Sequence, residues 1–180
     1  MQFKIIKAQE LEKQQREKIA ELCFAAFEED PWSQYAFMQN AFHIIGLLGE
    51  DIVSHALWTD RVFTLNNHVT LKTAYIEYVT TDSTMRGRGL ASKLLMYLIN
   101  ILTTKKYELA ALQPEVEAFY RKLGWVSWGG NLYIKHNISI YKTDGIEVML
   151  YPLSGGLKDQ IVCSLKNDKI CTDWREGELW

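Results

Sequence analysis

The sequence has few of the residues that hold small secreted proteins together. Its three cysteines, Cys23, Cys163 and Cys171, are an odd number and form no CxxC pair. Disulfide frameworks and structural zinc sites need regular cysteine spacings, so we expect neither. The four histidines also lack the spacing of metal ligands, and the sequence predicts no metal site.

Long apolar runs and an excess of one charge are absent as well. The first residues, MQFKIIKAQELEKQQREK, contain no apolar signal-peptide core, and no later run reaches membrane-spanning length. A formal net charge of −2 gives no overall field that would attract nucleic acid, so any anion site must be local. We therefore expect a cytoplasmic protein that binds neither nucleic acid nor a membrane.

The composition is that of a globular protein. Of the 180 residues, 48% are hydrophobic and 12% are aromatic, which is enough for a substantial core. The chain contains no linker, internal repeat or low-complexity segment. The sequence thus predicts one domain over residues 1–180, with residues 155–180 as a C-terminal tail.

Apolar patterns alternate between strand-like and helix-like along the chain. FKIIKA predicts a strand, and an apolar stripe from Leu11 to Phe27 predicts a helix that stops before Pro31. The turn signals LGED and LNNH divide residues 42–81 into three antiparallel strands. An amphipathic helix over about 87–104, the strand YELAAL, the helix PEVEAFYRKLG and strands near WVSW and IEVMLYPL follow. This order predicts an α/β (α+β) fold, a mixed sheet with helices on both faces.

A basic loop containing glycines joins the strand YIEYVTT to the long helix. Its sequence is Arg86-Gly87-Arg88-Gly89-Leu90-Ala91. Successive N–H groups at the positive end of a helix can converge on a diphosphate, to which the arginines add charge. The loop fits neither GxxxxGK[ST] nor GxGxxG. From these residues alone, an ordinary surface helix start explains the loop as well as a phosphate site does.

Two side chains outside this loop could carry acid–base chemistry. Glu77 is a carboxylate on an otherwise apolar strand just before the loop. Tyr120 lies beside the apolar stripe that Phe119 and Leu123 form on a later helix. The residue pattern leaves open an exposed strand charge for Glu77 and a core tyrosine for Tyr120.

The end of the sequence is rich in acids. Asp173, Glu176, Glu178 and the α-carboxylate of Trp180 lie within DWREGELW, where Arg175 is the one cation. Such a cluster would attract a cationic amine, whereas most chain ends are solvated tails.

The loop and the order of elements resemble the GCN5-related N-acetyltransferase (GNAT) family. The family's loop has the form Q/R-x-x-G-x-G/A, which Arg86, Gly89 and Ala91 match. The resemblance implies a GNAT fold, with a mixed, mostly antiparallel twisted sheet of six to seven strands, and acetyl-CoA as the cofactor. The cofactor-binding residues that it implies are Val79, Thr80, Thr81, Arg86, Gly87, Arg88, Gly89, Leu90 and Ala91.

The segments YIEYVTT, YELAAL, FYRKLGW and CTDWREGELW resemble the aminoglycoside 2'-N-acetyltransferases more closely. This resemblance implies direct transfer to the 2'-amino group, with Glu77 as a water-mediated base and Tyr120 as the acid that protonates the thiolate. A backbone N–H of Val79 or a neighbour would stabilise the oxyanion.

The same resemblance implies the walls of the substrate site. The terminal carboxylate of Trp180 would hold the amine and, with Glu77, help to remove its proton. Glu178 would contact the amino sugar and Asp30 would lie on the opposite wall, so that the tail closes the site.

The sequence departs from that pattern at two places. PWSQY lacks a second aspartate, and Gln113-Pro114 stands where the aminoglycoside enzymes have serines. Gentamicin-like or tobramycin-like and kasugamycin-like substrates therefore both stay open. A protein or peptide N-acetyltransferase and a non-catalytic acyl-CoA-binding or antibiotic-binding protein are the alternatives. A homodimer is open as the oligomeric state.

Overall fold

Two strands and one helix run across the boundary between the two units of this chain. The computed structural model describes residues 1–29, 32, 36–162, 167–176 and 180, with the backbone alone at 36, 37, 160 and 162. Unit 1 contains residues 1–59 and 76–100, and unit 2 contains residues 60–75 and 101–180. The elements that continue from one unit into the other are β3 (Asp51–Leu65), β4 (Val69–Thr81) and α3 (Leu90–Thr104).

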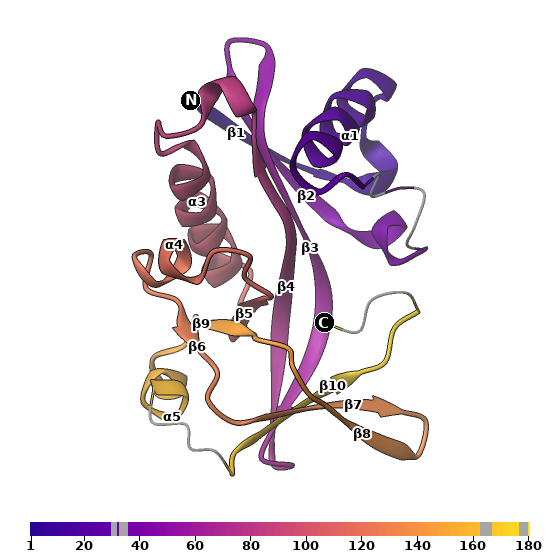
Figure 1. Ribbon diagram of the computed structural model, residues 1–180, viewed down its shortest axis with the longest axis vertical. Helices are drawn as coiled ribbons and strands as arrows, with labels where there is room; N and C mark the ends of the chain where they lie inside the picture. Colours follow the sequence, from indigo (N-terminus) through magenta and orange to yellow (C-terminus); the bar gives the residue numbers. More distant parts are fainter. Residues whose placement is uncertain (30–31, 33–35, 163–166, 177–179) are drawn as a thin grey trace. The chain divides into compact units, whose positions relative to one another are not determined.

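Unit 1 is built on antiparallel strands with a helix on either side. Strand β2 pairs with β1 and with β3. Figure 1 shows α1 and α3 on opposite sides of β1 and β2. The remaining elements of the unit are β1 (Gln2–Lys7), η1 (Ala8–Glu10), α1 (Lys13–Phe27), η2 (Ala36–Asn40), β2 (Phe42–Leu48) and η3 (Ser83–Met85).

Apolar and aromatic side chains pack both helices of this unit against its strands. Ile19 and Leu22 of α1 belong to a core cluster that includes Ile45 of β2. On the α3 side, the ring of Tyr97 stacks on Phe3 of β1 at a centroid distance of 4.7 Å. Helices on both faces are therefore confirmed within unit 1.

Local signals place the ends of α1. A capping box joins Glu12 and Gln15 at its start, which satisfies N–H groups that have no partner inside the helix. The helix ends at Phe27, and Glu28 adopts a left-handed conformation with φ 60°. The prediction that this helix stops before Pro31 is confirmed.

The predicted hairpin turns are also present. Asn66 and Asn67, between β3 and β4, have φ values of 50° and 63°, the conformation that tight hairpin turns require. Gly49, between β2 and β3, has φ 64°. Asparagine and glycine tolerate these angles better than other residues do, which is why LNNH and LGED mark the turns.

Unit 2 joins the rest of β3 and β4 to the C-terminal elements. Strand β4 pairs with β5 in parallel and β10 pairs with β7 in parallel, whereas the other recorded pairs of this unit are antiparallel. Its other elements are β5 (Leu109–Leu112), α4 (Glu117–Arg121), β6 (Val126–Ser127), β7 (Asn131–His136), β8 (Ser139–Thr143), β9 (Met149–Pro152), η4 (Gly155–Leu157), α5 (Lys158–Val162) and β10 (Lys169–Asp173).

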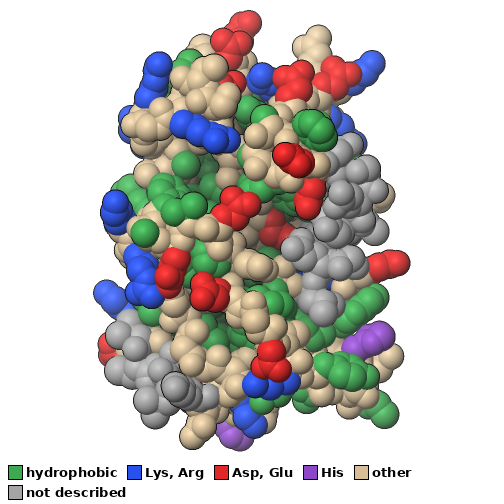
Figure 2. Space-filling view, viewed as in Figure 1, with side chains coloured by type: hydrophobic (Ala, Val, Ile, Leu, Met, Phe, Trp, Pro, Cys, Tyr) green, Lys and Arg blue, Asp and Glu red, His purple; other side chains and the backbone are tan. Residues whose placement is uncertain are grey.

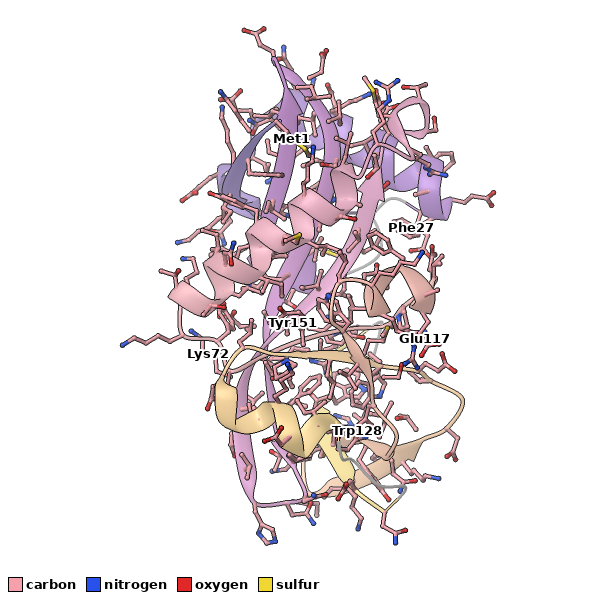
Figure 3. All side chains as sticks on the ribbon, turned by 90° about the vertical axis from the view of Figure 1, so that its left-hand side faces the viewer. Met1, Phe27, Lys72, Glu117, Trp128 and Tyr151 are labelled. Carbon is pink, nitrogen blue, oxygen red and sulfur yellow. The ribbon has the colours of Figure 1, made fainter. Side chains whose placement is uncertain are left out.

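The junction of β4 and β5 shows how unit 2 is held together. Lys72, labelled in Figure 3, donates its backbone N–H to Oε2 of Glu108 at 2.8 Å. The Nζ atom of Lys72 lies 4.2 Å from the ring centroid of Tyr107. The core of the unit includes Phe63, Leu109 and Trp180.

The β7–β8 hairpin exposes apolar side chains. Ile138, Ile140 and Tyr141 are exposed. Green side chains gather at the lower right of Figure 2, where Figure 1 draws this hairpin. Strand β8 is at the end of the strand order, so among the described strands it pairs with β7 alone.

Three expectations about the elements need correction. The described strands form a sheet of ten rather than six to seven, although it is mixed and mostly antiparallel as expected. Helix α3 begins at Leu90, because Gly87 and Gly89 are left-handed and cannot continue a right-handed helix. The helix predicted from PEVEAFYRKLG is only Glu117–Arg121. Within the described residues, no helix is long and apolar enough to cross a membrane.

Candidate active site

Strand β4 is interrupted next to Glu77. Tyr78 has φ 51°, a left-handed conformation that is unusual inside a strand and for a bulky residue. Such a residue breaks the alternation of faces and takes neighbouring peptide groups out of the regular ladder, as at a bulge. Glu77 and Val79, the predicted base and oxyanion donor, flank this residue, and both are half-buried.

The side chain of Tyr78 fixes the interruption in place. Its ring meets Phe27, labelled in Figure 3, edge to face at a centroid distance of 5.5 Å. Its hydroxyl donates to Oε2 of Glu29 at 3.1 Å. Two residues on, the hydroxyl of Thr80 donates to the carbonyl of Leu22 at 3.2 Å. The Thr80 hydroxyl is thus engaged in a hydrogen bond that stabilises the fold. If Thr80 contacts the cofactor, it would do so through its backbone.

The segment after β4 is shaped by Asp82. Its Oδ1 accepts hydrogen bonds from the backbone N–H and the hydroxyl of Thr84, at 2.9 and 2.6 Å. These bonds lower the pKa of Asp82, to which the charges of Lys18 and Arg86 add. Arg86 also donates from Nε to the carbonyl of Thr81 at 3.4 Å. The first arginine of the loop is thus held close to the strand end.

The loop then places two left-handed glycines before α3. Gly87 has φ 78° and Gly89 has φ 72°, and no atom lies within 4 Å of where a β-carbon would be on either residue. The first intrahelical bond runs from Lys93 N–H to the carbonyl of Gly89 at 3.1 Å. The N–H groups of the first helical turn have no partner within the helix. Open space and N–H donors therefore coincide at the start of a 15-residue helix.

Tyr120 lies in unit 2, on the short helix α4. Its side chain is only 8% exposed and meets the rings of Phe119 and Trp125 edge to face, at centroid distances of 4.9 and 6.0 Å. Burial, with a contribution from the charge of Glu115, raises the pKa of Tyr120 to about 12. The phenol therefore keeps its proton at neutral pH.

The C-terminal residue is anchored in unit 2. The indole of Trp180 is 2% exposed, packs edge to face on Phe63 at 5.7 Å and donates from Nε1 to Oγ1 of Thr143 at 3.0 Å. Two cations of the same unit lie at Tyr75, because the Cζ atoms of Arg61 and Arg175 are 5.4 and 5.3 Å from its ring centroid. Asp30 and Glu178, the other predicted substrate contacts, lie outside the described residues.

Unit 1 contains a buried histidine pair that was not predicted from the sequence. Nδ1 of His43 lies 2.9 Å from Nε2 of His55, and both side chains are fully buried. Burial lowers the pKa of His43 to about 4, helped by the charge of Arg16, and burial also holds the pKa of His55 well below its usual value. Both rings are neutral at pH 7. Their places on two consecutive predicted strands do not reveal the pair, because a shift of register brings the two residues to one face.

Comparison with known proteins fits this arrangement. A family model described as an acetyltransferase (GNAT) domain matches residues 4–127. No curated protein matches the chain. Among solved structures, the GNAT family N-acetyltransferase YhbS from Escherichia coli, in complex with CoA, has a TM-score of 0.62 at 12% identity, covering 98% of this chain and 90% of that one.

Other similar structures differ in length. Escherichia coli ElaA has a TM-score of 0.57 at 16% identity, covering 83% of this chain and 97% of that one. A GCN5-related N-acetyltransferase from Kribbella flavida has a TM-score of 0.57 at 20% identity, covering 72% of this chain. The match covers 35% of the Kribbella chain, so the protein spans about a third of that relative's length. At these identities the likeness shows the fold alone.

GNAT enzymes use acetyl-CoA as the acetyl donor. The matched family model spans residues 4–127 of 180, well over half of the sequence, and includes β4, the loop and α3. The chain belongs to the GNAT acetyltransferase family.

Proposed function

We propose that the protein is an N-acetyltransferase that transfers the acetyl group of acetyl-CoA to a small amine. One observation carries this proposal. Tyr78 is left-handed inside β4, between Glu77 and Val79, and the same unit continues into a loop with two left-handed glycines at the start of α3. A carboxylate, an irregular strand and a helix start with open space before it thus follow one another within 15 residues (Glu77–Ala91).

The loop suits the diphosphate of the cofactor. A β-carbon on Gly87 or Gly89 would occupy space that no protein atom fills, so the backbone can approach a ligand closely there. Backbone N–H groups of residues 87–91 would hold the diphosphate, and Arg86 and Arg88 would add positive charge. Val79, Thr80 and Thr81 would bind the cofactor along the strand. When bound, acetyl-CoA supplies an activated thioester.

Each catalytic role follows from the resemblance to the acetyltransferases, and the surroundings of each residue support it. The carboxylate of Glu77 would take the proton of the incoming ammonium through a water molecule, which leaves the nitrogen lone pair free to attack. The N–H of Val79, beside the left-handed Tyr78, would donate to the oxygen on which negative charge develops. Tyr120, protonated at neutral pH, would donate from its hydroxyl to the departing sulfur.

The acceptor that we propose is an aminoglycoside, acetylated on its 2'-amino group. The anchored indole of Trp180 supports this choice, because it limits where the carboxylate of the same residue can lie. That carboxylate, with Glu178 and Asp30, would attract a protonated amino sugar. The proposal covers sugars of the kasugamycin type as well as gentamicin-like and tobramycin-like polycations.

A substrate screen tests the proposal. Purified protein is incubated with acetyl-CoA and kasugamycin, gentamicin, tobramycin or a set of peptides with free amines, and thiol release is followed with a thiol reagent. Mass spectrometry of the product checks that each thiol released corresponds to one acetyl group gained. Acetylated amino sugar is the expected result. Acetylated peptide alone would establish the protein or peptide N-acetyltransferase, and CoA binding without any product would establish the non-catalytic alternative. Sedimentation velocity on the same sample tests the homodimer.

A further inference from the structure

Unit 1 contains a cavity that the proposed acetyl transfer does not use. Its volume is about 320 Å³, and its lining comes from the segment before α1, from α1 itself and from the segment before β2. The described lining residues are Ala8, Gln9, Arg16, Trp32, Met38 and Gln39. None of them belongs to the loop at residues 86–91. A space of this size can hold a small organic molecule.

The charge of this lining is positive. Arg16 is the one ionised side chain among the described lining residues, and no ion pair to it occurs within the described part of the chain. Its Nη2 donates to the carbonyl of Ala8 at 2.6 Å, which orients the guanidinium without neutralising it. A guanidinium has five N–H donors and matches a carboxylate in geometry. Gln9 and Gln39 add neutral polar groups to the lining.

The apolar part of the lining is a flat, oriented ring. Trp32 stacks on His43 at a centroid distance of 5.5 Å and an interplanar angle of 10°. His43 lies behind the lining and is near enough to Arg16 for that charge to act on it. Met38 contributes a polarisable thioether, which packs well against aromatic groups. A planar apolar body is the natural complement to Trp32 and Met38.

A hydrogen-bonded chain leads from behind this lining to β4. His55 hydrogen-bonds to the backbone of Tyr78, and its Nδ1 also lies 3.9 Å from Sγ of Cys23. Nε2 of His55 faces Nδ1 of His43 at 2.9 Å. Both rings are neutral, so one of these two nitrogens donates to the other.

The other ring nitrogen of His43 is a buried polar atom that the described residues leave unsatisfied. Nε2 of His43 has no hydrogen-bond partner among the described residues, although the side chain is fully buried. Buried polar atoms without partners are rare in folded proteins and call for an explanation. Met38 also belongs to the small core cluster against which Tyr78 packs. The cavity is therefore joined to Tyr78 both by packing and by the histidine pair.

We propose that this cavity is a binding site for a small aromatic carboxylate. The carboxylate pairs with Arg16, the ring packs on Trp32 and Met38, and occupancy is transmitted through His43 and His55 to Tyr78. The inference goes beyond the proposed function and does not depend on it, because its test measures binding rather than acetyl transfer.

The test uses benzoate as the probe. Benzamide has the same ring without the charge, and benzylamine reverses the charge. Calorimetry is done with the wild-type protein, with Arg16→Gln and with Lys13→Gln, the control on the same helix whose Nζ forms an exposed ion pair with Glu17. Amide NMR spectra of the same samples report on Gln9, Gln39 and Val79.

Benzoate is expected to bind at least about tenfold more tightly than benzamide, and benzylamine is expected not to bind. Arg16→Gln should weaken benzoate binding by about tenfold or more, whereas Lys13→Gln should keep it within about twofold. Benzoate should shift the amide signals of Gln9, Gln39 and Val79 in the wild-type protein and in Lys13→Gln. Arg16→Lys keeps the charge and should retain part of the benzoate affinity. This variant replaces Arg16→Gln in the test if Arg16→Gln does not fold.

Three results would overturn the proposal. One is a failure of benzoate to bind by either method. Another is equal affinity for benzoate and benzamide, which would remove the role of the charge. The third is unchanged benzoate affinity in a folded Arg16→Gln variant.

Discussion

The indole of Trp180 donates a hydrogen bond to the hydroxyl of Thr143 at 3.0 Å and is nearly fully buried. Thr143 ends strand β8, so the C-terminal residue is tied to the hairpin of β7 and β8. Anchoring of this kind restricts the α-carboxylate, which shares its residue with the indole. The charge at the chain end can therefore be tested separately from the anchor.

We predict that moving this charge abolishes most acetylation. A few uncharged residues appended after Trp180 should lower acetylation of the best amino sugar by about tenfold or more, because the carboxylate no longer faces the ammonium. Calorimetric affinity for CoA should stay the same. The same residues appended at the N-terminus are the control.

A second control separates charge from anchoring. Thr143→Val removes the acceptor of the indole hydrogen bond and should lower the free energy of unfolding by about 1 kcal/mol while leaving the carboxylate in the chain. Urea unfolding measures this loss. If the extended protein acetylates as fast as the wild type, the tail has only a structural role.

Gly89 provides the sharpest test of the cofactor loop. Gly89→Val should weaken CoA binding by about tenfold or more in calorimetry, because the β-carbon and methyl groups enter the open space before α3. The left-handed φ also strains the variant by about 1–2 kcal/mol.

Gly145→Val is the matched control for this strain. Gly145 has φ 78°, also with nothing within 4 Å of a β-carbon, and belongs to the segment between β8 and β9. The Gly145→Val variant should lose a similar amount of its free energy of unfolding and keep its CoA affinity. Equal CoA affinity of Gly89→Val and the wild type would exclude the loop as the diphosphate site.

Tyr120→Phe removes the hydroxyl group that is the proposed acid and keeps the aromatic ring. We expect the turnover number to fall by about tenfold or more with both Michaelis constants nearly unchanged, because the hydroxyl interacts with the sulfur only as the bond to it breaks. Steady-state kinetics with the best acceptor from the screen measure both. Tyr141→Phe, at an exposed position on β8, is the control. Turnover within about twofold of the wild type would remove Tyr120 from the mechanism.

The buried histidines predict a pH dependence of stability. The pKa of His43 is about 4 in the folded protein, against 6.5 for an unperturbed side chain, so the unfolded chain binds the proton more readily. Stability is then fully present above pH 6.5 and falls as the pH drops toward 4, by up to about 1.4 kcal/mol per pH unit for this group. His55, with a lowered pKa, adds to the loss.

Urea unfolding between pH 7 and pH 5 measures this loss. His43→Gln should flatten the profile over this range, and His68→Gln, in the exposed β3–β4 turn, should not. A wild-type profile that is as flat as that of His43→Gln would contradict the neutral pair.

Local chemistry explains which parts of this arrangement the sequence could predict. Asn66 and Asn67 tolerate left-handed angles, so the hairpin could be located from LNNH. Gly87 and Gly89 also tolerate left-handed angles, so they mark the position of the loop. The basic charge of the loop is a second signal. Both signals depend only on neighbouring residues, which is why the sequence suffices to locate the loop. The roles of Glu77, Tyr120 and Trp180 remain predictions.

The histidine pair could not be located in this way because of a bulge. Leu48 pairs with Asp51, and a uniform register from that turn would set His43 opposite Ala56, with His55 on the other face. The register shifts between Gly46 and Leu47, so His43 pairs with Leu57 instead. One extra residue in β3 therefore brings both histidines to one face. No local sequence pattern indicates this extra residue in β3.

Strand β10 was missed for a different reason. Its five residues are too few to give a clear periodicity, and its neighbours lie far away in the sequence. Ile170 pairs with Leu65 of β3 and with Leu132 of β7. Where β7 begins, a β-carbon on Gly130 would lie 2.9 Å from the carbonyl carbon of Asp168, so only glycine allows this approach. Such pairing depends on the folded chain rather than on a local motif.

The place of β10 between β3 and β7 also sets an order of events in folding. A growing chain that has not reached residue 173 leaves the edges of both neighbours open, and strand edges of this kind pair readily with other chains. Closing the gap joins residues about a hundred positions apart, which is a slow step compared with forming the β7–β8 hairpin. Unit 2 thus completes its sheet late, by inserting a strand rather than by adding one at an edge.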